Sequence, residues 1–186
     1  FENYVKQFTD LGHLVCLEQG PGGNHVAGRF LRASDLGDTS EHADWKTVIL
    51  DSATGETHVP KGTMGERWGE EGVGKWNLEL DGIDPQLSLH GNSDDAVTID
   101  TRGVPVKRLA DGTLVTTVLD LTLAQYGVAR DGLPGEWPTG YDDDAPFTPA
   151  WQELRTGIKA ADVIKVARQF ARNAERPKGR SMIVMG

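Results

Sequence analysis

The sequence predicts a mixed α+β and α/β fold, with a β-rich middle over about 14–120 and a helix–strand unit over 147–186. The middle is predicted by short apolar runs that come in pairs around turn-forming residues. The end is predicted by one long stretch of helical periodicity that is followed by a short, unbroken apolar run. A helix, a tight connection and a buried strand together form half of a doubly wound α/β unit.

The helix of this unit is expected from Ala160 to Glu175. Its apolar residues recur three and four positions apart, which gives one apolar stripe. They are residues 160, 163, 164, 167, 170, 171 and 174. Pro177 and Gly179 then end the helix and turn the chain. The run from Met182 to Met185 is too short for a helix and is typical of a strand buried on both faces.

Three hairpins are expected in the middle of the chain, each around a glycine-containing turn. Their strand pairs are 13–18 with 26–31, 46–50 with 56–59, and 105–109 with 114–119. Further short strands are predicted at 76–80, 87–89 and 96–99. Helical segments are predicted at 1–8, 33–36 and 122–126, and a loop at 130–145. These short elements explain why the middle is described as β-rich.

Composition excludes several classes of function. A net charge of −9 argues against binding to nucleic acid or directly to an anionic membrane surface. The single cysteine, Cys16, cannot form an intramolecular disulfide or hold a four-cysteine iron–sulfur cluster. Cys16 lies in an apolar run, so a buried and inert thiol is expected.

No catalytic constellation is visible in the residues themselves. The histidines are scattered without metal-ligand spacing, which favours ordinary surface or turn positions over a metal site. They are residues 13, 25, 42, 58 and 90. The tryptophans are expected to be core or interface anchors, with a ligand platform as the alternative. They are residues 45, 68, 76, 137 and 151. A basic pocket around Arg29, Arg32, Lys107 and Arg108 is a further possibility.

Several stretches together resemble the large, or alpha, subunit of membrane-bound respiratory nitrate reductase, a molybdopterin oxidoreductase. Residues 8–11, 14–15 and 28–36 resemble a run shared by a wider branch of that superfamily, with Gly12 in place of the usual Pro. Residues 59–69 and 74–79 resemble the nitrate reductase branch in particular. The match continues through 105–109, 116–124, 141–143, 148–151, 156–158 and 179–186.

The resemblance implies that 147–186 is the helix–strand edge of a Rossmann-like cofactor domain. It also implies a bis-molybdopterin guanine dinucleotide cofactor, molybdenum and a 4Fe-4S cluster in the full-length subunit. The implied partners are an iron–sulfur beta subunit and a membrane cytochrome b gamma subunit, in a complex on the cytoplasmic side of the cell membrane. Nitrate is the implied substrate. Among the residues of this chain, only Gly186 matches a cofactor-binding position of the family, and none matches a metal ligand or catalytic position.

We therefore expect 1–186 to be an internal segment of a larger catalytic subunit, because it begins at Phe1 without Met and ends at Gly186. The full-length enzyme is expected to reduce nitrate to nitrite at molybdenum. This segment alone is expected to hold no cofactor and to be inactive. Two alternatives remain open at this point: a nitrite oxidoreductase of the same branch, and a stand-alone, non-catalytic β-rich binding module.

Overall fold

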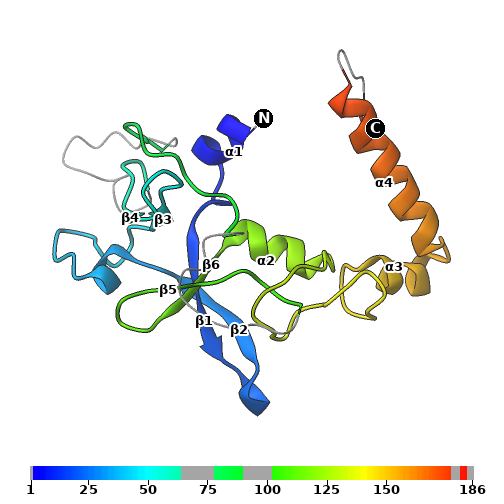
Figure 1. Cartoon of the computed structure of the whole chain (residues 1–186), viewed down its shortest axis with the longest axis horizontal. Helices are drawn as coiled ribbons and strands as arrows, with labels where there is room; N and C mark the ends of the chain where they lie inside the picture. The colour runs from blue at the N-terminus through cyan, green and yellow to red at the C-terminus, as the bar shows by residue number, and fades with distance from the viewer. Residues whose placement is uncertain (1, 64–77, 90–101, 177–180, 184–186) are drawn as a thin grey trace.

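A computed structural model describes residues 2–63, 78–89, 102–176 and 181–183. A four-stranded antiparallel sheet with the order β2-β1-β6-β5 forms its centre (Figure 1). Its strands are β1 (Leu14–Gln19), β2 (His25–Phe30), β5 (Lys107–Arg108) and β6 (Leu114–Thr117). A second pair, β3 (Ile49–Leu50) and β4 (Thr57–His58), forms a separate hairpin. All three predicted hairpins are therefore present.

The sheet has apolar residues packed on both of its faces. Its central strand β1 lies between β2 and β6, and four successive residues, Leu14 to Leu17, are buried. On one face Leu14 and Cys16 pack with residues from β3 and the segment before it. On the other face Leu17 packs with Ala124 of helix α2 (Val118–Gln125). Alternation of side chains along β1 explains the two separate clusters.

Strand β6 ends earlier than the sequence analysis predicted, because Thr117 begins helix α2. The Thr117 hydroxyl accepts a hydrogen bond from the backbone N–H of Asp120 at 3.0 Å. Such a cap satisfies one of the free N–H groups at a helix start. Val118 and Leu119, predicted as strand, therefore belong to the helix, which also extends the predicted turn at 122–126.

The remaining helices and turns follow their predicted positions. Helix α1 (Glu2–Phe8) opens the chain, and two 3-10 turns, η1 (Pro21–Gly23) and η2 (Ala33–Leu36), flank β2. The described part of 76–80 contributes only an isolated bridge between Lys61 and Glu79, and 87–89 contains no strand. The predicted strand at 96–99 lies outside the described residues.

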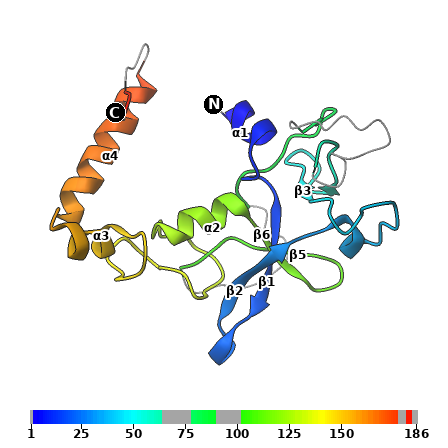
Figure 2. The same ribbon diagram turned by 180° about the vertical axis from the view of Figure 1, so that it is seen from behind.

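Helices α3 (Pro149–Thr156) and α4 (Ala160–Glu175) form an arm that projects from the sheet, as both views show (Figures 1 and 2). The bounds of α4 are those predicted. Glu153 fixes the bend between the two helices: its carboxylate accepts from the Ala160 N–H at 2.8 Å and from Lys159 Nζ at 2.6 Å. Gly157 ends α3 in the left-handed conformation, φ 74°, which glycine adopts without steric cost.

The predicted buried strand after α4 is not seen in its described residues. Met182 and Ile183 lie outside any strand, with exposed fractions of 80% and 75%. A buried strand needs neighbouring strands to pair its backbone and cover its faces, and the sheet of this chain lies elsewhere. The rest of the predicted strand, 184–185, lies outside the described residues.

Candidate functional site

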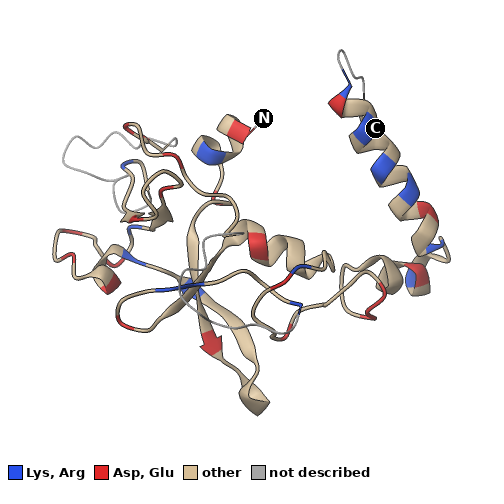
Figure 3. Ribbon diagram, in the orientation of Figure 1, with Lys and Arg blue, Asp and Glu red and all other residues tan. Residues whose placement is uncertain are grey.

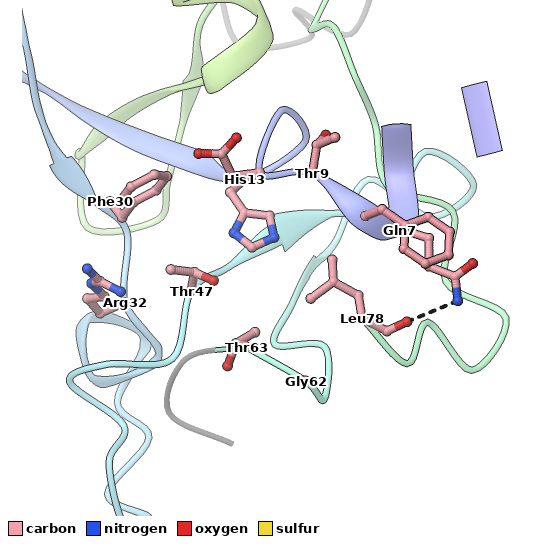
Figure 4. A pocket seen from close by; sticks show the side chains of 11 residues that line it. Gln7, Thr9, His13, Phe30, Arg32, Thr47, Gly62, Thr63 and Leu78 are labelled. Carbon is pink, nitrogen blue, oxygen red and sulfur yellow. Dashed lines mark hydrogen bonds between the residues drawn. The ribbon is translucent and has the colours of Figure 1, made fainter. Parts of the chain in front are cut away.

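A hollow of about 330 Å³ lies where the end of α1, the start of β1, the end of β2 and the 62–63 loop meet (Figure 4). Figure 4 shows the His13 ring extending between Thr47 and Leu78, with Thr63 across from it and Arg32 beside Phe30. Phe8, Phe30 and Leu78 supply apolar lining, and the other lining residues are polar or glycine. The hollow therefore offers hydrogen-bonding groups against an apolar wall.

His13 is buried in this hollow, with 7% of its surface exposed, which contradicts the predicted surface or turn position. Burial lowers the pKa of His13 from 6.5 to about 4, while Asp10 raises it and Arg32 lowers it further. The ring is therefore neutral at pH 7 and has one donor and one acceptor nitrogen. Within the described residues, its Nε2 atom has no hydrogen-bond partner.

The four basic residues considered in the sequence analysis do not form one pocket. The strand order places Arg29, on β2, and Lys107 and Arg108, on β5, at opposite edges of the sheet. Arg29 instead binds Asp35 through both guanidinium nitrogens, at 2.6 and 2.7 Å. Arg32 alone among the four lines the His13 hollow.

A buried ion pair joins α2 to the segment that follows it. Asp120 is fully buried, and its carboxylate lies 2.5 Å from Arg130 Nη1. Ser88 Oγ and the Leu89 N–H also donate to this carboxylate, at 3.1 and 3.4 Å. These contacts bring together three parts of the chain that are far apart in sequence, so we assign the pair a structural role.

A second hollow, of about 260 Å³, lies between the arm and the loops beside α2. Tyr126, Val128 and Phe147 line it on one side, and Val163 and Ile164 of α4 on the other. No residue of α4 is buried, and Val166 and Phe170 remain 62% and 40% exposed. Helix α4 also carries Lys165, Arg168 and Arg172, and Arg168 lines this same hollow. Figure 3 shows several basic residues along α4.

The predicted cofactor-binding residue, Gly186, lies outside the described residues. Over 2–63, 78–89, 102–176 and 181–183, no group of three His, Cys, Asp or Glu side chains could hold a metal ion. Cys16 is buried, as expected, and burial raises the pKa of its thiol. Within these same ranges, no helix is long and apolar enough to cross a membrane.

The chain was compared with proteins of known function. It is 50% identical to the nitrate reductase alpha subunit of Mycobacterium tuberculosis, over 100% of this chain and 17% of that protein. It is 42% identical to the nitrate reductase alpha chain of Bacillus subtilis, over 100% of this chain and 16% of that protein. The chain is a relative of nitrate reductase alpha subunits.

Identity of 41% with the respiratory nitrate reductase 1 alpha chain of Escherichia coli covers 100% of this chain and 17% of that one. The resemblance found in the sequence is thereby confirmed over the whole chain. The chain spans about a sixth of the length of these nitrate reductase alpha subunits. No family model matches the chain.

Sequence reasoning missed two features of the site. Asp120 lies in the first turn of an apolar helix, three residues after the cap Thr117, and that pattern could have indicated a capped, buried carboxylate. The burial of His13 has no comparable local signal. It depends on β3, α1 and the 62–63 loop meeting at the start of β1, and these segments are distant in sequence.

Proposed function

We propose that this chain is a segment of a respiratory nitrate reductase alpha subunit, and that the full-length subunit reduces nitrate to nitrite. The observation that carries the proposal is identity of 39–50% to such subunits over the whole chain. Since all the relatives reported above are named nitrate reductases, neither the nitrite oxidoreductase nor the stand-alone module is favoured.

The described residues do not fit the metal groups that this family implies. A 4Fe-4S cluster needs four thiolates, and the one cysteine of this chain is buried with a raised pKa. In the full-length subunit, bis-molybdopterin guanine dinucleotide and molybdenum would supply the redox chemistry. We therefore assign those ligands to other parts of the subunit, and a supporting role to this chain.

That supporting role rests mainly on α4. Its apolar stripe is only partly covered: Val163 and Ile164 line the second hollow and are half-buried, whereas Phe170 is 40% exposed. We propose that this stripe packs against the sheet of a Rossmann-like cofactor domain, with Gly186 at the edge of the cofactor site. Burying Phe170 there would contribute roughly 1.5–3 kcal/mol. The same role for 147–186, as the edge of a cofactor domain, was implied by the resemblance in the sequence.

The remaining assignments follow from the family. We propose an iron–sulfur beta subunit and a membrane cytochrome b gamma subunit as partners, and a location on the cytoplasmic side of the membrane. The name of the Escherichia coli relative, an alpha chain of a respiratory enzyme, supports a complex of several subunits. We propose no nucleic-acid partner, because the net charge of −9 would repel a phosphate backbone.

The test compares activity in both directions. The complete subunit, purified from its gene with its partners, should reduce nitrate with a reduced viologen dye. It should oxidise nitrite with an oxidised dye much more slowly. The 186-residue chain, tested in parallel by elemental analysis, should contain no molybdenum and should show no turnover above the buffer blank. Turnover by the complete subunit only in the nitrite direction would overturn the proposal.

The role of α4 is tested by Phe170→Asp in the complete subunit, with Gln169→Asp as the matched control. Gln169 is the neighbouring residue and lies outside the apolar stripe. Molybdenum content should fall in the first variant and stay at the wild-type value in the second. Equal content in all three proteins would place the stripe away from the cofactor domain.

A further inference from the structure

Two buried polar groups line the His13 hollow without a hydrogen-bond partner in the described part of the chain: His13 Nε2 and Thr63 Oγ1. Their residues have exposed fractions of 7% and 3%. Leaving a buried donor or acceptor unpaired is costly, and such groups are uncommon in folded proteins. A group from outside the chain that enters the hollow would satisfy both.

The charge at this hollow favours an anion with one negative charge. Arg32 is held beside it, because Nη1 donates to the Trp45 carbonyl at 2.7 Å and the guanidinium lies 5.6 Å from the centre of the Phe30 ring. A guanidinium has five N–H donors and matches the two oxygens of a carboxylate. Asp10, exposed at the rim, would disfavour a more highly charged anion.

The size and walls of the hollow favour a ligand with an apolar body. Its volume of about 330 Å³ is at the lower end of the range for small-molecule sites. Phe8, Phe30 and Leu78 offer apolar surface, while Thr47, Thr63 and His13 offer polar atoms. A metal ion is a poor fit, since Asp10 is the one carboxylate among the described residues that line the hollow.

We propose that the His13 hollow binds a small organic carboxylate, whose charged end pairs with Arg32 and hydrogen-bonds to His13 and Thr63. The apolar body of the ligand lies against Phe8, Phe30 and Leu78. The proposal does not rest on the nitrate reductase assignment. The imidazole of His13 takes part in its neutral form and donates one hydrogen bond.

The experiment is equilibrium dialysis of the full chain at pH 7 with radiolabelled benzoate, and with benzamide as the neutral analogue of the same shape. Benzoate should bind saturably to one site, and benzamide at least about tenfold more weakly, since it lacks the charge that pairs with Arg32. The result that would overturn the proposal is benzoate binding that does not saturate, or equal binding of the two probes.

Variants identify the site. Arg32→Gln should weaken benzoate binding about tenfold or more, and Arg32→Lys should restore part of it, because the charge returns without the fork of donors. Arg29→Gln, on β2 and three residues before Arg32, is the matched control, since Arg29 pairs with Asp35 and does not line the hollow. An Arg29→Gln loss equal to that of Arg32→Gln would place the binding elsewhere.

Thr63→Val separates ligand binding from stability. The variant removes a buried hydroxyl that has no partner in the described residues, so its urea midpoint should equal or exceed that of the wild type. Benzoate binding should nevertheless weaken several-fold, because one hydrogen bond is lost. Unchanged benzoate affinity in this variant would show that the hydroxyl does not meet the ligand and would overturn the proposed site.

Discussion

The sheet and the arm of this molecule use their apolar residues in opposite ways. The sheet, β3–β4 and α2 enclose two clusters of buried residues, with side chains such as Leu14, Leu50 and Val115 fully covered. Helices α3 and α4 contain no buried residue, although α4 has a continuous apolar stripe. The difference shows that periodicity defines a helix, whereas its burial depends on a partner surface.

The largest expected loss of stability comes from the buried Asp120–Arg130 ion pair beside the sheet. Asp120→Asn removes the buried carboxylate charge that pairs with Arg130, and breaking a buried ion pair costs about 3–5 kcal/mol. The midpoint of urea unfolding should fall accordingly. Asp162→Asn, in the exposed first turn of α4, is the control and should leave the midpoint nearly unchanged. Equal midpoints for the two variants would refute the difference between the regions.

A pair of large-to-small variants compares the regions directly. Leu50→Ala should destabilise this chain by about 2–5 kcal/mol, because it opens a cavity in a closed core. Phe170→Ala should change its stability by less than about 0.5 kcal/mol, because that ring is 40% exposed and lies on the uncovered part of the stripe. Chemical denaturation followed by circular dichroism measures both. A large loss in Phe170→Ala would mean that α4 is already packed in the isolated chain.

The pH dependence of stability should report on His13. Its pKa is about 4 in the folded chain and near 6.5 when unfolded, so the unfolded state binds the proton more readily. The contribution of neutral His13 to the free energy of unfolding is complete above pH 6.5 and is lost as the pH falls towards 4. The free energy of unfolding should therefore fall by about 2 kcal/mol between pH 7 and pH 5. Asp10 opposes this shift and Arg32 adds to it.

The measurement is urea unfolding at pH 7, 6 and 5. His13→Phe should flatten the profile over this range, and His42→Phe, which alters an exposed ring, should retain the wild-type slope. If His13→Phe keeps the full slope, His13 binds its proton equally well in the folded and unfolded chain, and the burial argument fails.

The smallest expected free energy is that of local unfolding of helix α4. Its amides, 160–175, should exchange with solvent at an opening free energy near zero to about 1 kcal/mol, while those of β1 should approach the global value. Hydrogen exchange followed by NMR on the monomeric chain gives both. Protection of α4 equal to that of β1 would contradict the picture of an uncovered arm.

The sequence predicted the elements whose signals are local. The bounds of α4 follow from its periodicity and from the proline after it, and the hairpins follow from their turn residues. The end of β6 was wrong by two residues, since the strand propensity of Val118 and Leu119 is outweighed by the cap at Thr117. Local propensity therefore placed the elements better than it placed their ends.

The site was less predictable, because its residues meet only in three dimensions. His13 was expected at the surface, although it lies next to a strand that is buried on both sides. Asp120 and Arg130 are ten residues apart, and no periodicity relates them. The expected strand was not found at Met182 and Ile183, and α4 is not buried, for one reason: each needs a surface that the described part of this chain does not provide.

The bend at Glu153 makes the arm a lever. A 16-residue helix is about 24 Å long, so a tilt of about 5° at its base displaces its far end by about 2 Å. The Glu153 carboxylate resists that tilt, because it holds Lys159 and Ala160 at the N-terminal end of α4. A small displacement there moves the other end of the helix furthest. Glu153, more than 20 residues upstream, thus helps to set the position of whatever follows Glu175.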